Sequence, residues 1–318
     1  MAKIMVTGAN GFIGGRICSD LLKFGHHVTG ISLGKESDIQ HPNYRYIAAD
    51  ISDLHRIRTI FMENEMDILL HFAAIAHAVK GFKVSAETYK RVNYLAAKNI
   101  FKCAFEKNVR IFFAGTVDVY GAGKGNEWRE DVIPHPVNEY GKSKFTAEQY
   151  LQKLYEKKKD LYLIGRLAPV YAADRLVDIY KRFYLKYPNL VFSLGTKPEY
   201  SFLALDNLSR FVCRWVNGEK TDGNIINLCD DRSIQVQEII ALEKIEGRAE
   251  YVIKIPAFIA KVAAAIARRM LFSKSKAELG LSLTKLFCPF KINNMQIKNT
   301  GCCRTGIDEI VYGNKGVR

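Results

Sequence analysis

A glycine-rich turn between an apolar run and an amphipathic run constrains the fold of this chain more than any other feature. The apolar run 3–7 (KIMVT) leads into GANGFIGG, where Gly8, Gly11 and Gly14 recur at every third position. Such glycines permit a tight turn, the approach of a pyrophosphate and close packing of helix on strand. The N-terminus of the following helix attracts an anion through its unpaired N–H groups and its dipole. The turn therefore predicts a dinucleotide-binding unit.

Strand-like and helix-like runs alternate over the first 170 residues. We expect strands at 3–7, 27–33, 44–49, 67–74, 110–116 and 161–167, and helices at 12–24, 53–65, 86–107 and 139–159. Apolar strands that alternate with helices indicate a parallel sheet covered on both faces. The predicted fold class is therefore α/β, a Rossmann-type doubly wound parallel sheet with a smaller mixed C-terminal substrate lobe.

Beyond residue 171 the alternation is weaker. We expect a helix that ends near Pro188, a strand at 223–230, helices at 235–245 and 255–272, and an irregular tail from Ser273. The helix 255–272 pairs an Ala/Ile-rich face with two arginines, which suits either packing inside the lobe or contact with an anionic membrane. Of these two interpretations, packing inside the lobe is favoured.

Charge and cysteine usage limit the classes of protein. The net charge is +14, and residues 244–318 carry 14 Lys and Arg against 5 Asp and Glu. A basic lobe suits a nucleic acid, an anionic membrane or a phosphorylated small molecule, or it is a solvated surface. The seven cysteines are scattered without a CxxC spacing, which predicts a reduced cytoplasmic compartment and no metal site. We expect no leader peptide and no membrane span.

A tyrosine and a lysine stand four residues apart in the expected helix 139–159. Tyr140 and Lys144 would project from one face of that helix. A cation about 4 Å from a phenolate stabilises it by roughly 4 kcal/mol, or about three pKa units. The pair can then exchange a proton with a sugar hydroxyl while a nicotinamide exchanges a hydride. Thr116 ends the expected strand 110–116 at the ligand-binding edge of the sheet, where it can hold that hydroxyl.

The end of the second strand informs the choice of cofactor. Ser32 stands where an acidic residue would bind the ribose of NAD, and Lys35 follows closely. A small residue with a nearby cation suits the 2′-phosphate of NADP, and Arg16 could assist. The alternative is that Ser32 hydrogen-bonds the ribose of NAD. The sequence leaves NADP or NAD as the cofactor, with NADP slightly favoured.

Six motifs together resemble the extended short-chain dehydrogenase/reductase superfamily, closest to its NAD(P)-dependent sugar-nucleotide epimerases, dehydratases and ketoreductases. They are TGANGFIG (7–14), HFAA (71–74), GTVDVYG (115–121), YGKSK (140–144), RLAPVYA (166–172) and SFLALDNL (201–208). Their order and spacing match the superfamily over nearly the whole chain. The resemblance implies a dinucleotide domain at 1–171, to which 223–243 return, and a substrate lobe built from 172–222 and 244–318.

The resemblance also implies roles for individual residues. Thr116, Tyr140 and Lys144 would be the catalytic triad, with Tyr140 and Lys144 also touching the cofactor. The cofactor would further contact Gly8, Asn10, Gly11, Phe12, Ile13, Gly14, Ser32, Lys35, Asp50, Ile51, Phe72, Ala73 and Ala74. The substrate would contact His77, Thr116, Asp118, Lys197 and Tyr200. The helices 86–107 and 139–159 would form the surface of a homodimer.

The chain departs from the superfamily at three places near the expected substrate. The family often has an asparagine where this chain has Pro169, which removes an amide contact to the substrate. Val117 replaces the acid that dehydratases carry after the strand-five threonine, and Asp118 follows it. This departure argues against elimination of water. Tyr200 replaces an arginine that grips the diphosphate, and Lys197, Arg175 or a C-terminal cation could supply the missing charge.

The sequence thus predicts an NAD(P)-dependent 4-epimerase or 4-ketoreductase that acts on a nucleoside-diphosphate hexose. The alternative is a non-catalytic dinucleotide- or RNA-binding member of the superfamily, which the basic tail supports. The complete set of Thr116, Tyr140 and Lys144 argues against that alternative, and we expect no nucleic-acid partner. His71 is expected to be a core histidine, whereas His77 follows the fourth strand and is a candidate substrate ligand.

Overall fold

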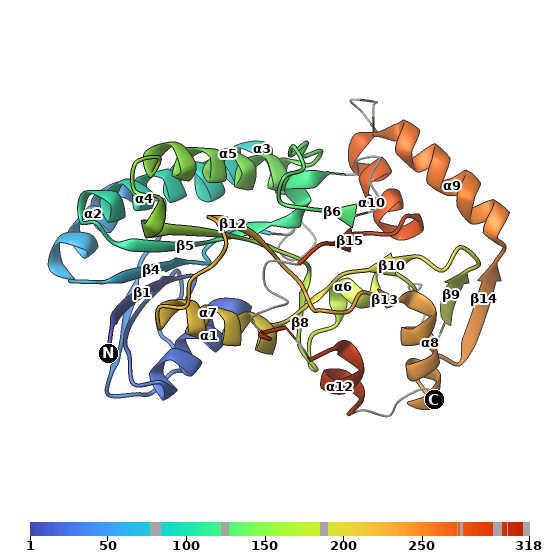
Figure 1. The fold of residues 1–318 in the computed structure, drawn as a ribbon, viewed down its shortest axis with the longest axis horizontal. Helices are drawn as coiled ribbons and strands as arrows, with labels where there is room; N and C mark the ends of the chain where they lie inside the picture. The colour runs from blue at the N-terminus through green and yellow to red at the C-terminus, as the bar shows by residue number, and fades with distance from the viewer. Residues whose placement is uncertain are drawn as a thin grey trace. The chain divides into compact units, whose positions relative to one another are not determined.

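Seven strands form the central sheet, in the spatial order β12-β7-β5-β4-β1-β2-β3 (Figure 1). They are β1 (Lys3–Thr7), β2 (His27–Ser32), β3 (Tyr44–Ala48), β4 (Ile68–His71), β5 (Arg110–Thr116), β7 (Tyr162–Leu167) and β12 (Ile225–Leu228). The pairs β1–β2, β2–β3, β1–β4 and β4–β5 are parallel. The chain adds β2 and β3 on one side of β1, and then crosses over to add β4 and β5 on the other side. This topology confirms the predicted Rossmann-type doubly wound class.

The computed structural model describes residues 1–76, 84–121, 127–184, 190–271, 273, 276–294, 301–303 and 305–313. The described residues divide into two compact units. Unit 1 comprises residues 1–116, 139–166 and 209–226, and unit 2 comprises 117–138, 167–208 and 227–318.

Helices cover both faces of the sheet in unit 1. They are α1 (Phe12–Lys23), α2 (Leu54–Glu63), α3 (Ala86–Tyr89), α4 (Ala97–Glu106), α5 (Glu139–Leu154) and α7 (Leu205–Val216), and a short turn η3 (Lys159–Leu161) follows α5. Figure 1 shows α2, α4 and α5 on one face, and α1 with α7 on the other. This arrangement explains why β4 is buried along its whole length and why apolar residues precede His71 in it.

Each face of the sheet has its own packing. On the side of α2, α4 and α5, the buried cluster includes Met5, Leu69, Ile100, Phe113 and Leu151. On the opposite side, Trp215 of α7 packs 5.8 Å from the ring of Phe112. Ser209 of α7 donates a hydrogen bond of 2.7 Å to Asp20 of α1, which ties these two helices together.

The expected helix 86–107 is continuous but contains one wide turn. Between α3 and α4 the backbone forms the π-helical segment η1 (Lys90–Ala96). Asn93 lies in this segment and is almost fully buried. A π-turn inside an α-helix often marks a functional position, because it redirects side chains.

Unit 2 contains short strands and five helices among its described residues. The strands are β6 (Glu127–Trp128), β8 (Val170–Tyr171), β9 (Leu190–Leu194), β10 (Glu199–Tyr200), β11 (Leu203–Ala204), β13 (Ile234–Gln235), β14 (Tyr251–Ile255) and β15 (Lys291–Ile292). The helices are α6 (Val177–Tyr180), α8 (Val236–Ile245), α9 (Ala257–Met270), α10 (Ala277–Phe287) and α12 (Ile307–Tyr312), and a turn η2 (Val117–Tyr120) follows β5. The strands pair two by two: β10 with β13, β11 with β8, β14 with β9 and β15 with β6.

The units divide the chain differently from the predicted domain boundaries. Helix α8, which we expected to return with 223–243 to the dinucleotide domain, buries Ile239 and Ile240 in the core of unit 2. The larger part of α7, expected in the substrate lobe, belongs to unit 1. The strand near Ile225 does join the large sheet as β12. The role of the second unit as a substrate lobe stays a prediction.

Two expectations for the C-terminal half are wrong. Over the described residues up to 184, the expected long helix before Pro188 comprises only α6, because Tyr184 pairs as an isolated bridge with Val191 of β9. The tail is not irregular from Ser273, since α10 packs closely against α9. A Cβ on Gly280 of α10 would lie 2.9 Å from the carbonyl oxygen of Ala267, so the glycine permits this approach.

All seven cysteines lie among the described residues, and none of them forms a disulfide. The described residues include no group of three His, Cys, Asp or Glu side chains arranged to hold a metal ion. No helix in the described part of the chain has the length and apolar character needed to cross a membrane.

Candidate active site

The glycine-rich turn lies where the order of the strands reverses. Gly8 follows β1 with a φ of +77°, which favours glycine. A Cβ at this position would lie 2.8 Å from the backbone nitrogen of Ala73, which follows β4. The turn after β1 therefore contacts the chain leaving β4, at the crevice where open α/β sheets bind ligands.

The first turn of α1 forms an anion cradle that a larger residue would fill. A Cβ on Gly11 would lie 3.0 Å from the carbonyl oxygen of Gly8, and a Cβ on Gly14 would lie 2.2 Å from the same atom. The N-cap residue of α1 is Gly11, which has no side chain to cap the helix, and the first residues of the helix are Phe12 and Ile13. The helix dipole and the glycine backbone fit the pyrophosphate of a dinucleotide.

Asn10 fastens the loop after β2 to the glycine-rich turn. Its side-chain amide donates hydrogen bonds to the carbonyl of Glu36 (2.6 Å) and to the hydroxyl of Tyr46 (3.1 Å). Tyr46 in turn donates to the carbonyl of Gly34 at 2.5 Å. These bonds hold the loop that begins at the half-buried Ser32 and contains the exposed Lys35.

Arg16, which we expected to assist with a 2′-phosphate, instead pairs with Asp20 one turn along α1. The distance from its Nε to the carboxylate is 2.6 Å. At the end of β3, Asp50 accepts hydrogen bonds of 2.8 Å from both the backbone and the hydroxyl of Ser52. Ile51 is buried in the core of unit 1. The predicted contacts of Asp50 and Ile51 with the adenine stay predictions.

The residues after β4 border the glycine-rich turn. Phe72 and Ala73 are half-buried and Ala74 is exposed. His71, at the end of β4, is fully buried and shares a hydrogen bond of 2.7 Å with the hydroxyl of Thr7. Burial, together with the charge of Lys144, lowers the pKa of His71 to about 3, so the ring is neutral. The expectation that His71 is a core histidine is confirmed, whereas His77 lies outside the described residues.

Asn93 is a positioning residue that sequence reasoning missed. Its side chain accepts a hydrogen bond from the backbone of Ile75 (2.8 Å) and donates one back to its carbonyl (2.9 Å). It also donates to the hydroxyl of Ser143, which donates to the carbonyl of Tyr140 at 2.8 Å. Asn93 thus joins the chain after β4 to the first turn of α5. The feature of the sequence that could have indicated this role is the presence of an asparagine among apolar positions of the expected helix 86–107.

Helix α5 runs antiparallel to β5, which fixes where its catalytic candidates lie. At the C-terminal end of α5, the hydroxyl of Tyr155 donates to the carbonyl of Val109, just before β5. Further back along the helix, Lys144 lies over the ring of Phe113, with 4.3 Å from Nζ to the centroid. The turn that carries Tyr140 therefore lies toward Thr116, at the carboxyl end of β5.

Lys144 is buried, and its ammonium group has no polar partner within the described part of the chain. Burial, opposed by the charge of Glu148, lowers the pKa of Lys144 to about 7. Glu148 is itself occupied, because Arg166 forms a buried bidentate ion pair with it. Within the described part of the chain, Lys144 makes neither a hydrogen bond nor an ion pair. Such an ammonium group is suited to donate hydrogen bonds to the ribose hydroxyls of a dinucleotide.

Unit 2 holds the second group of predicted site residues. Asp118 accepts hydrogen bonds from Lys285 of α10 (2.6 Å) and from Asn138 (3.2 Å). Burial alone would raise the pKa of Asp118, but the charge and hydrogen bond of Lys285 bring it below its usual value. Val117 is buried and contributes no polar atom. The only acid at this turn is therefore ionised and paired.

The two remaining candidates differ in exposure. Tyr200 is buried in the core of unit 2, donates its hydroxyl to the carbonyl of Leu286 at 2.6 Å and packs under the guanidinium of Arg182. Lys197 is exposed in the turn before β10, with a φ of +47°. Tyr200 thus acts as a packing residue in this structure, and Lys197 is available to a ligand.

Residues 4–186 of the chain match the family described as the NAD dependent epimerase/dehydratase family. A dTDP-D-glucose 4,6-dehydratase of Mus musculus is 31% identical over 180 residues, which cover 53% of this chain and 50% of the mouse protein. The chain thus spans about half the length of the curated relatives it matches.

Two solved structures share the fold. The UDP-glucuronic acid 4-epimerase of Bacillus cereus, solved in complex with NAD, has a TM-score of 0.64 and 24% identity over 80% of this chain and 88% of its own. The Bordetella bronchiseptica enzyme WbmH, in complex with NAD+, has a TM-score of 0.71 and 20% identity over 98% and 96% of the two chains. At these identities, the likeness shows the fold alone.

Proposed function

The chain belongs to the NAD dependent epimerase/dehydratase family, and on that premise we propose that it is a 4-epimerase or 4-ketoreductase of nucleoside-diphosphate hexoses. The single observation that carries this proposal is the buried Lys144, one helical turn from Tyr140 and without a polar partner among the described residues. A buried ammonium group without a polar partner costs stability. Its presence beside Tyr140 therefore supports a role in binding or catalysis.

Each residue of the triad has a distinct role in the proposal. The bound nicotinamide cofactor supplies hydride exchange at the carbinol carbon of the sugar. Tyr140 exchanges the proton of the same hydroxyl, and Thr116 accepts or donates the hydrogen bond that holds this hydroxyl. Lys144 binds the ribose of the cofactor and stabilises the negative charge that develops on the oxygen of Tyr140.

Product analysis tests the proposed activity. The purified chain is incubated with UDP-hexoses to detect 4-epimers, and with a 4-keto-sugar nucleotide and NADPH to detect reduction. Mass spectrometry of the co-purifying cofactor separates the two reactions, because an epimerase retains NAD and a ketoreductase exchanges NADPH. Failure of both assays, with dinucleotide binding intact, would support the non-catalytic alternative.

The finer choice of cofactor rests on two residues. We propose a preference for NADP, since no acidic side chain stands at Ser32 and the exposed Lys35 follows it in a loop held by Asn10. The pairing of Arg16 with Asp20 means that Arg16 gives no support to this preference. Calorimetric titration with NADP and with NAD measures this preference.

The proposed substrate is a nucleoside-diphosphate sugar. Lys197 is the proposed contact to the diphosphate, because it is exposed and stands close in sequence to Tyr200, where the family arginine is missing. His77, Asp118 and Tyr200 are further proposed substrate contacts, although the hydroxyl of Tyr200 already donates a hydrogen bond to the carbonyl of Leu286. We propose further that no nucleic acid binds.

We also propose that the chain forms a homodimer through α4 and α5 and works in the cytoplasm. The compartment is inferred from seven cysteines that form no disulfide. Sedimentation of the purified chain tests the dimer. Charge-reversing changes at the half-buried Lys98 and the exposed Lys142 should favour the monomer if these helices form the interface.

A further inference from the structure

The outer side of α9 in unit 2 exposes large apolar side chains. Their exposed fractions are 69% for Phe258, 45% for Ile259, 57% for Val262 and 55% for Ile266. The side of α9 that packs against α10 buries only two small residues, Ala260 and Ala267. A helix that belongs to a globular core shows the reverse arrangement, with large side chains inside.

The exposed side chains form a continuous stripe along the helix. Phe258, Val262 and Ile266 are spaced by four residues and lie on successive turns of one face. On the strand β14 that precedes α9, Tyr251 and Ile253 are also exposed, at 61% and 47%. Contiguous apolar surface of this kind marks an interaction site.

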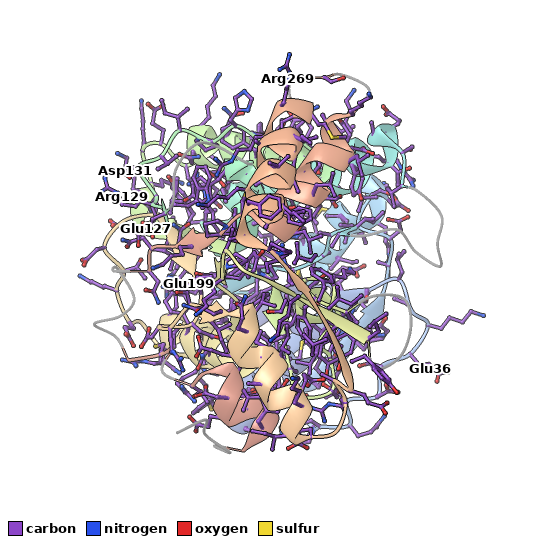
Figure 2. The ribbon with its side chains drawn as sticks, turned by 90° about the vertical axis from the view of Figure 1, so that its right-hand side faces the viewer. Glu36, Glu127, Arg129, Asp131, Glu199 and Arg269 are labelled. Atoms are coloured by element: carbon purple, nitrogen blue, oxygen red, sulfur yellow. The ribbon has the colours of Figure 1, made fainter. Side chains whose placement is uncertain are left out.

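Cations border this apolar stripe. Lys254, Lys261, Arg268 and Arg269 are all exposed, and residues 251–271 contain no Asp or Glu. Within the described part of the chain, none of the four forms an ion pair. Figure 2 faces this side of unit 2 and shows Arg269 projecting outward from the end of α9.

We propose that α9 lies in the plane of an anionic lipid surface, with its apolar stripe among the headgroups and its cations against lipid phosphates. A cationic helix with an exposed apolar face is typical of such interfacial contact. A second copy of the same face is disfavoured, because a symmetric contact would set these cations against one another. The proposal is independent of the catalytic activity proposed above.

Vesicle sedimentation with the full chain tests the lipid contact. The protein should sediment with vesicles that contain phosphatidylglycerol, sediment poorly with phosphatidylcholine alone, and dissociate at high salt. F258Q/V262Q/I266Q should lower partitioning at least about tenfold, since it removes the three apolar side chains that would be buried in the lipid. R268Q/R269Q should lower it about 25-fold, from roughly fivefold for each cation.

The double variant K157Q/K159Q is the matched control. It removes the same charge from an exposed site in unit 1, and should change partitioning less than R268Q/R269Q. Absence of binding to the anionic vesicles would overturn the proposal. So would partitioning of F258Q/V262Q/I266Q equal to that of the parent. Dissociation of a parent dimer by F258Q/V262Q/I266Q in ultracentrifugation would assign the stripe to self-association and overturn it equally.

Discussion

The ammonium group of Lys144 lies 4.3 Å from the ring centroid of Phe113 and has this aromatic face as its contact. This contact holds the first half of α5 against the middle of β5. Since the helix and the strand run antiparallel, Tyr140 lies toward Thr116. Burial lowers the pKa of Lys144 to about 7. The protonation of this lysine should therefore change when a polar or charged ligand binds beside it.

Tyr140→Phe should abolish turnover and leave dinucleotide binding nearly intact. The change removes only the oxygen that transfers the proton, and general acid–base catalysis contributes roughly 10²–10⁴ in rate. Steady-state assays and calorimetry measure the two properties. Turnover within about threefold of the parent would refute the assignment of Tyr140.

Lys144→Met should stabilise the cofactor-free protein at neutral pH. The folded pKa of about 7 lies below the unfolded value, so the unfolded chain binds more protons between these values and the parent gains stability as pH rises. The variant should therefore be more stable by roughly 2–5 kcal/mol at pH 7, and the difference should shrink toward pH 10.

Chemical denaturation of both proteins across this pH range measures the difference. Lys153→Met, at an exposed position of the same helix, is the matched control and should show no such trend. The Lys144 variant should also bind the dinucleotide more weakly. A stability difference independent of pH would contradict the buried, shifted lysine.

Asn93→Ala should destabilise the protein and slow turnover together. The change leaves the part-buried backbone groups of Ile75 without their partner, and the cost of each is at most the roughly 1–3 kcal/mol of a fully buried unsatisfied group. Ser143→Ala should cost less, because it removes the hydrogen bonds of the Ser143 hydroxyl with Asn93 and Tyr140 but leaves both bonds between Asn93 and Ile75 in place. Equal effects of the two changes in thermal unfolding would contradict the central role of Asn93.

The chain should not dehydrate UDP- or dTDP-hexoses, although a mouse relative is named as a dTDP-D-glucose 4,6-dehydratase. Elimination of water needs a proton donor, and Val117 has none. Asp118 is held ionised by Lys285, so its lowered pKa excludes it as a donor at neutral pH. Incubation with both sugars and detection of a 4-keto-6-deoxy product would show this prediction to be wrong.

The cofactor preference is tested by titrating both dinucleotides in a calorimeter. We expect tighter binding of NADP(H), and Ser32→Asp should shift the preference toward NAD by placing a carboxylate against the 2′-phosphate. Lys35→Ala should weaken NADP binding more than NAD binding. Tighter binding of NAD by the parent would reverse the proposal.

The sequence by itself determined the parts of the molecule that depend on local spacing. The glycines at 8, 11 and 14 predict the turn after β1, because their effect depends on neighbouring backbone atoms. The four-residue spacing of Tyr140 and Lys144 places both on one face of α5. Continuous apolar runs predict the buried strands, since parallel strands covered on both faces carry no polar side.

Only the tertiary structure decided which charged groups are paired. Asp118 and Lys285 are 167 positions apart, and nothing local indicates that α10 supplies a cation to the turn after β5. Glu148 pairs with Arg166, so Lys144 forms no ion pair within the described part of the chain, although Glu148 lies one turn away on the same helix. Likewise, α9 turns its large apolar residues outward because Gly280 lets α10 occupy its small-residue face. Such pairings arise from packing between distant segments, which periodicity and spacing do not encode.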